Sequence, residues 1–212
     1  MALRYHIIPV TPFAQNCSII WCDTTHHAAV IDAGGDLLRI EAGLQQQSLI
    51  VEKLLLTHGH IDHAGGAAQL AQRLGVHIEG PEASERFWLD QLPQQSQMFG
   101  FPYSEALSPA RWLRDGDTVS IGNEVLTVFH CPGHTPGHVV FYSQTANLLI
   151  AGDVLFQGSI GRTDFPMGNH QHLVNAIRNK LFVLPDETNV ITGHGPMTTI
   201  GKERRDNPFV TM

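Results

Sequence analysis

The chain has 212 residues, 42% of them hydrophobic and 16% charged, and its formal net charge is −7 at pH 7. This length and composition predict one globular domain spanning residues 1–212, and the negative charge argues against nucleic acid or an anionic membrane as a partner. Because no apolar run approaches the ~18 residues of a membrane span and the first ten residues lack a secretory signal, we expect a cytoplasmic protein.

The first half of the chain alternates strands with helices. Short β-type runs at residues 4–10, 16–22 and 27–35 end in Pro, Asp or Gly, as expected of connected strands. Apolar spacing then predicts a helix over residues 36–47 with Asp36 as its cap, and a buried strand at 49–57. A second helix over residues 63–75 ends at Gly75 and precedes a short strand at 76–79.

The second half returns to strands and closes with a helix and a strand. Strands are predicted at residues 117–122, 124–130, 137–143, 147–153 and 189–193, with a helix over 169–184. Two β-rich stretches, each followed by helices, indicate an α/β fold with two sheets face to face and helices outside. Between the halves, the aromatic-rich segment 84–112 could cover either the core or a site, and we favour the core.

Four stretches place His or Asp at the C-terminal end of an apolar strand: LLLTHGHIDH, VFHCPGH, LLIAGD and VITGH. Strand ends at one sheet edge can converge, and rigid scaffolds often present ligands there. Successive side chains of the cluster within residues 57–66 point to opposite sides of a loop, so its members cannot all bind one ion. We therefore expect two neighbouring ions, with ligands drawn from His58, His60, Asp62, His63, His134, Asp153 and His194.

The stretch THGHIDH resembles the T-H-x-H-x-D-H motif of the metallo-β-lactamase superfamily, and the later His, Asp and His follow in the expected order. The resemblance implies a four-layer αββα sandwich of two mixed β-sheets flanked by helices. It also implies one metal on His58, His60 and His134, a second on Asp62, His63 and His194, and Asp153 as the bridge. Imidazole and carboxylate ligands suit two divalent ions, zinc first, with iron or manganese as alternatives.

Within that superfamily, GHTPGH and AGDVLFQGSIGRTDF are most similar to glyoxalase II, the hydroxyacylglutathione hydrolases, and above all to their short bacterial YcbL-type branch. This resemblance implies a small-molecule thioester as substrate, a glutathione conjugate such as S-lactoylglutathione. Arg162 aligns with a basic residue that helps to hold glutathione, whereas Asp164 stands where an aromatic residue is expected. The basic residues of the stretch 201–212 could add carrier contacts, but we favour a solvated surface for them.

The expected reaction is thioester hydrolysis by a metal-bound hydroxide, with catalytic roles for Asp62 and Asp153. The stretch GRTDF is also similar to persulfide dioxygenases, and this resemblance implies the main alternative, a mononuclear iron enzyme in which His58, His134 and Asp153 would bind the iron. A non-catalytic protein whose metals only stabilise the fold is the lesser alternative, because structural zinc sites are usually closed and rich in cysteine, whereas this site consists of His and Asp. We expect Cys131 to be a small buried residue and His138 to support the site without binding metal.

Overall fold

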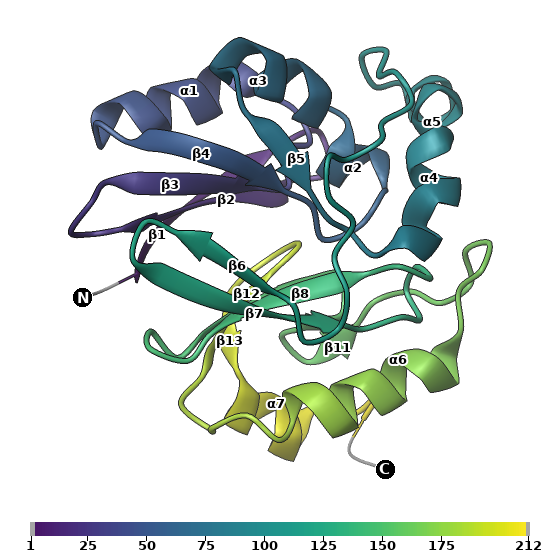
Figure 1. Ribbon diagram of the computed structural model, residues 1–212. Helices are drawn as coiled ribbons and strands as arrows, with labels where there is room; N and C mark the ends of the chain where they lie inside the picture. Colours follow the sequence, from purple (N-terminus) through teal and green to yellow (C-terminus); the bar gives the residue numbers. More distant parts are fainter. Residues whose placement is uncertain (1–2, 211–212) are drawn as a thin grey trace.

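A five-stranded sheet carries the first half of the chain in the computed structural model, which describes residues 3–210 (Figure 1). Its strands lie in the order β1-β2-β3-β4-β5. Their bounds are Leu3–Val10, Gln15–Cys22, His27–Ile31, Ile50–Leu55 and His77–Glu79. The sheet is mixed, because β1, β2 and β3 pair antiparallel whereas β4 runs parallel to both β3 and β5.

A second sheet, of six strands, has the order β13-β12-β9-β8-β7-β6. The bounds of β6 to β9 are Thr118–Ile121, Glu124–His130, Val139–Ser143 and Leu148–Gly152, and those of β12 and β13 are Asn189–Thr192 and Thr198–Thr199. Only β12 and β9 pair in parallel within this sheet. A small ribbon of β10 (Leu155–Phe156) and β11 (Ser159–Ile160) follows β9.

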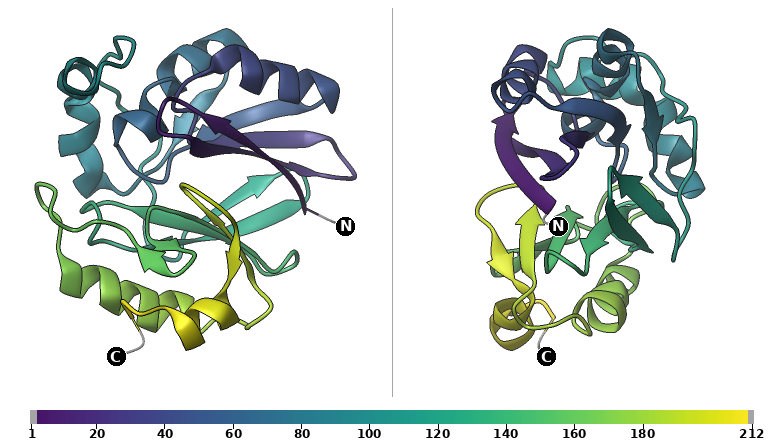
Figure 2. Two further views of the ribbon diagram at one scale, coloured as in Figure 1. Left: turned by 180° about the vertical axis from the view of Figure 1, so that it is seen from behind. Right: turned by 60° about the vertical axis from the view of Figure 1, so that its left-hand side comes forward.

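Helices cover the outer faces of both sheets, as the two views in Figure 2 show. Over the first sheet lie α1 (Leu37–Gln46) and α3 (Ala67–Leu74). Over the second lie α6 (His170–Ala176), continued by a π-helical turn at Ile177–Leu181, and α7 (Ile200–Asp206). The short helices α2 (Ile61–Ala64), α4 (Arg86–Asp90) and α5 (Leu92–Phe99), with a 3₁₀ turn at Ala83–Glu85, gather at one end.

Three apolar cores separate the four layers. The middle core joins the two sheets and contains Ile20, Leu55 and Phe141. One outer core packs residues such as Ile40 of α1 against the first sheet, and the other packs residues such as Leu173 of α6 against the second. The αββα sandwich with two mixed sheets is therefore confirmed. None of the helices within residues 3–210 is long and apolar enough to cross a membrane.

Local details differ from the sequence predictions in the first layer. Asp36 precedes α1 with φ +49° and its carboxylate accepts the Thr11 N–H at 2.8 Å, so its side chain does not cap the helix. The helix predicted over 63–75 is divided into α2 and α3. At the division, a Cβ on Gly66 would lie 2.7 Å from the Ala33 carbonyl oxygen, so only glycine allows the loop after β3 to pack this closely. Gly75 ends α3 as predicted, with φ +68°.

Candidate metal centre

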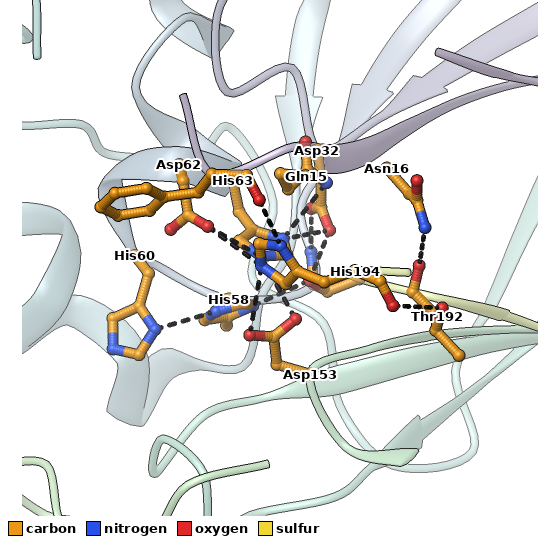
Figure 3. Close-up of polar contacts among 12 residues, drawn as sticks. Gln15, Asn16, Asp32, His58, His60, Asp62, His63, Asp153, Thr192 and His194 are labelled. Atoms are coloured by element: carbon orange, nitrogen blue, oxygen red, sulfur yellow. Dashed lines mark hydrogen bonds and ion pairs between the residues drawn. The ribbon is translucent and has the colours of Figure 1, made fainter. Parts of the chain in front are cut away.

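The strand ends bring the predicted ligands to one place, and Figure 3 labels all of them except His134. The loop after β4 carries His58 and His60, and α2 carries Asp62 and His63. The three loops after β7, β9 and β12 carry His134, Asp153 and His194. Because these loops leave their strands at the same end of the sandwich, residues far apart in the sequence become neighbours, for example Asp62 and His194, which are 132 positions apart.

Three imidazoles form the first group. The Nδ1 atom of His60 lies 3.1 Å from Nε2 of His58 and 3.0 Å from Nε2 of His134. A tetrahedral zinc ion with Zn–N bonds of about 2.0–2.1 Å holds its nitrogen ligands roughly 3.3 Å apart. The three nitrogen atoms therefore have nearly the spacing that one ion imposes on its ligands.

Asp62, His63 and His194 form the second group. The Nε2 atom of His194 lies 3.1 Å from Oδ2 of Asp62, and Nε2 of His63 lies 3.6 Å from the same oxygen. Candidate ligand atoms of the group all lie within 4.8 Å of one another. One carboxylate and two imidazoles at this spacing could hold a second divalent ion.

Asp153 lies between the two groups. Its Oδ1 atom is 3.3 Å from Nε2 of His63, and its Oδ2 atom is 3.5 Å from Nε2 of His134 and 3.7 Å from Nε2 of His194. The carboxylate thus faces one member of the first group and two members of the second. This is the position that a bridging ligand requires.

Oxygen atoms behind the imidazoles fix which nitrogen faces the centre. Nδ1 of His63 lies 2.9 Å from the Asp32 carboxylate, and Nδ1 of His134 lies 2.7 Å from the Arg162 carbonyl oxygen. Nδ1 of His194 lies 3.0 Å from the Phe13 carbonyl oxygen. We assign the proton to Nδ1 in each case, because only a donor satisfies these oxygens, and Nε2 then presents its lone pair to a metal.

The Nδ1 atom of His58 also faces a hydrogen-bond acceptor, which here is the Thr57 hydroxyl. Its Nδ1 lies 3.0 Å from Oγ1 of Thr57, and that hydroxyl donates to Asp32 at 2.7 Å. The hydroxyl can then accept the Nδ1 proton, which leaves Nε2 of His58 free to bind metal. Asp32 therefore orients one imidazole in each group.

Unpartnered polar atoms at the centre also fit a metal. Nε2 of His63 and Oδ1 of Asp153 are buried and lie 3.3 Å apart, but neither atom makes a hydrogen bond within residues 3–210. Buried polar atoms are rarely left unsatisfied. A divalent cation between the two groups would satisfy both atoms, so the residues present fit the implied ions.

The protonation states of two imidazoles of the first group and of Asp153 suit metal binding. Burial lowers the pKa of His60 to about 3 and holds the pKa of His58 well below its ordinary value, so both imidazoles are neutral at pH 7. Burial alone would raise the pKa of Asp153, but the neighbouring imidazoles, His63 foremost, keep that pKa well below its ordinary value. Neutral imidazoles and an ionised carboxylate are the forms that bind divalent ions.

Two supporting carboxylates were missed by the sequence analysis. Asp32 ends the apolar run HAAVID, the same pattern that identified the other strand-end residues, so the sequence did contain a signal for it. Glu85 has no such signal. It is fully buried in the 3₁₀ turn, and its two oxygens accept the N–H groups of Gly59 at 2.9 Å and Gly137 at 2.7 Å. Glu85 thereby ties together the two loops that carry the first group.

The remaining predicted residues lie around the centre. Cys131 is buried and outside the candidate ligand groups. Nε2 of His138 accepts the Asp153 N–H at 3.1 Å, and its ring stacks on His58 at 4.6 Å, as expected of a supporting residue. Arg162 lies exposed on the wall of a cavity above the centre, where it donates two hydrogen bonds to Asp164.

The segment 84–112 proves to have both of the roles considered for it. Leu89 and Leu92 are buried in the first outer core, whereas Trp88, Met98 and Phe99 line the cavity.

Three basic residues lie on α7, and none of them lines the cavity: Lys202, Arg204 and Arg205. Arg204 and Arg205 form ion pairs with Asp186 on the outer layer.

Comparison with known proteins agrees with the fold and with a metal-dependent hydrolase. Residues 10–194 match the metallo-beta-lactamase superfamily. Hydroxyacylglutathione hydrolase GloC of Haemophilus influenzae is 46% identical over 209 residues, which cover 98% of this chain and 98% of that protein. The crystal structure of the B3 metallo-beta-lactamase BLEG-1 superimposes with a TM-score of 0.91 at 37% identity, covering 99% of this chain and 100% of that chain. TTHA1623 in a di-iron-bound form gives a TM-score of 0.87 at 33% identity, covering 96% and 99%. The chain therefore belongs to the metallo-β-lactamase superfamily, in which it is a metal-dependent hydrolase similar to the hydroxyacylglutathione hydrolases.

Proposed function

We propose that this hydrolase cleaves hydroxyacyl thioesters of glutathione, with S-lactoylglutathione as the test substrate. The name of the GloC relative supports this substrate class. We further propose that the enzyme uses two divalent ions, zinc first, with iron or manganese as alternatives. The ligands are those that the two groups provide, namely His58, His60, His134, Asp62, His63 and His194, with Asp153 as the bridge.

One observation carries the proposal: two groups of three ligands face a shared carboxylate. Structural zinc sites are closed and rarely binuclear, whereas hydrolytic sites keep positions open to water and substrate. Here His58 and His63 are fully buried behind the centre, while His60, Asp62 and Asp153 form the floor of the cavity. A substrate in the cavity can therefore reach the centre from one side only.

When bound, the ions would supply hydroxide at neutral pH and polarise the thioester carbonyl. The chain itself holds the ligands in place. Asp32 orients His63 directly and His58 through the Thr57 hydroxyl. The His138 ring accepts the backbone N–H of Asp153 and so helps to position that residue. A thiol leaving group has an ordinary pKa of about 8.5, so it departs as thiolate without a strong proton donor. The reaction therefore needs no separate proton donor on the cavity floor, which consists of the metal-binding groups.

The test follows two reactions on the same protein loaded with zinc, manganese or iron. Cleavage of S-lactoylglutathione is measured beside oxygen uptake with glutathione persulfide, and metal content is measured in each preparation. We expect thioester cleavage that is lost on chelation and returns with metal. Oxygen uptake on the persulfide without thioester cleavage would instead support the iron dioxygenase, whose ligands would be His58, His134 and Asp153.

A further inference from the structure

The cavity above the metal centre has a mainly apolar wall. Its volume is about 900 Å³, and its floor is the metal centre. The apolar side chains of the wall include Phe13, Trp88, Met98, Phe99, Ile160 and Phe165, and its polar side chains include Gln91, Gln94, Gln95 and Gln157. These apolar side chains come from the β1–β2 turn, α4, α5 and the segment after β9, so the fold assembles this wall from four separate parts of the chain.

The wall leaves apolar surface open to whatever enters the cavity. Met98 is 75% exposed, Phe13 is 46% exposed and Phe99 is 45% exposed. The rings of Phe13 and Phe99 meet edge to face at 6.0 Å, and Phe165 lies 4.8 Å from His60 of the first ligand group. Exposed aromatic clusters of this kind commonly mark a binding surface. Here the cluster leads directly to the metal centre.

The wall provides little positive charge for an anionic carrier. Arg162 is the only lysine or arginine among the described residues that line the cavity. Its guanidinium is already engaged, with bonds of 3.0 Å and 2.9 Å to the Asp164 carboxylate and a position 4.5 Å from the centroid of the Phe165 ring. The metal-free chain carries a net charge of −7, and two divalent ions would reduce it to about −3, so the overall charge of the protein does not attract an anionic carrier.

We propose that the site selects thioesters by their apolar part and does not require an anionic carrier, because Asp164 neutralises the one cation on the wall. This inference rests on the proposed thioester hydrolase function and narrows its substrate class. The preferred substrates carry an apolar acyl or thiol group, and the carboxylates of a carrier such as glutathione contribute little to binding. Phe99 and Asp164 are then the residues that determine specificity.

The first test varies the carrier alone. S-Lactoylglutathione is compared with the same thioester made on glutathione diethyl ester, in which both carboxylates are masked. We expect the diester to be cleaved with a kcat/KM at least equal to that of the free acid. A preference for the free acid of about tenfold or more, the size of one charge-assisted hydrogen bond, would overturn the inference.

The second test varies the charge on the wall. Asp164→Ala frees the Arg162 guanidinium, so we expect the KM for S-lactoylglutathione to fall about two- to fivefold, the range for an exposed ion pair, with kcat unchanged. The KM for the diester should stay the same, because it has no carboxylate to meet the freed cation. An unchanged or raised KM for S-lactoylglutathione would show that Asp164 does not screen the site.

The third test varies the acyl group. Longer 2-hydroxyacyl chains on the diester should lower KM by up to about fourfold for each methylene that becomes buried. Phe99→Ala should weaken this gain, whereas Tyr103→Ala, which removes an exposed aromatic outside the cavity, should not. No gain with chain length would also overturn the inference. Failure to cleave any of these thioesters would instead refute the proposed function.

Discussion

Glu85 is a buried carboxyl whose titration should be visible in the stability of the protein. Burial raises its pKa from 4.5 to about 7. Its oxygens face the N–H groups of Gly59 and Gly137 rather than a lysine or arginine, so the charged form lacks a cationic partner. In the unfolded chain the same carboxyl ionises near its ordinary value. Folding therefore favours the protonated form across the interval between the two pKa values.

The sign and size of the effect follow from this difference. As pH rises through the interval, the unfolded chain loses the proton of Glu85 before the folded protein does, so folding becomes less favourable. The difference of about 2.5 pKa units corresponds to roughly 3 kcal/mol at 1.36 kcal/mol per unit, all of it present once the pH exceeds about 7. Glu85→Gln removes the titration. The free energy of unfolding of the variant minus that of the wild type should therefore rise by roughly 3 kcal/mol from pH 4.5 to 7.

Urea unfolding of the metal-free proteins, followed by circular dichroism from about pH 5 to about pH 7.5, measures most of this change. Metal-free protein is needed because a nearby cation would lower the pKa of Glu85. Glu82→Gln is the matched control. Burial raises the pKa of Glu82, but hydrogen bonds from Ser84 lower it further, so its own titration falls below pH 4.5. The charge of Glu82 adds a minor part to the raised pKa of Glu85, so the difference for Glu82→Gln should rise over this range by only a small part of the rise for Glu85→Gln. Equal rises for the two variants, or no rise for Glu85→Gln, would refute the reasoning.

Three further predictions concern the metal centre. Asp153→Ala should lower activity more than His138→Ala, because Asp153 faces both ligand groups; equal losses at unchanged metal content would contradict this. Asp32→Ala should weaken metal affinity about 10–100-fold in chelator competition, since the His63 imidazole loses its acceptor; unchanged affinity would count against that role. Gly34→Ala should reduce bound metal, measured by elemental analysis, because its Cβ would lie 1.5 Å from the Asp62 carbonyl oxygen. Gly35→Ala, with its Cβ 3.2 Å from a Thr11 methyl group, should keep the metal.

The sequence predicted the strands and the gathering of the ligands because both depend on short patterns. An apolar run fixes a buried strand, and a His or Asp directly after it must lie at the end of that strand. Asp32 follows the same rule and could have been found. Its role behind two imidazoles could not, because that role depends on the pairing of β3 with β4, which brings Asp32 within 2.7 Å of the Thr57 hydroxyl.

Features that depend on contacts between distant segments could not be predicted from the sequence. The division between α2 and α3 arises from the packing of Gly66 against Ala33, and the local sequence continues a helical pattern across it. The last helix, α7, has few apolar residues and was expected to be a solvated surface. It forms because Thr199 caps its first turn and because Glu203, buried within it, accepts a hydrogen bond from the Thr198 hydroxyl.

The metal-binding residues depend on short sequence patterns, whereas the shape and charge of the cavity wall depend on contacts in the folded chain. The floor of the cavity needs particular ligand types at strand ends, so its residues follow a recognisable motif, of which THGHIDH is the longest part. The wall needs only apolar surface in the right place, which many side chains can provide, and here it combines Phe13, Trp88, Phe99 and Phe165. A motif search therefore identifies the class of metal-dependent hydrolase, whereas the proposed preference between carriers depends on whether Arg162 is free or paired. That pairing is a matter of geometry, because only the folded loop shows both guanidinium bonds directed at Asp164.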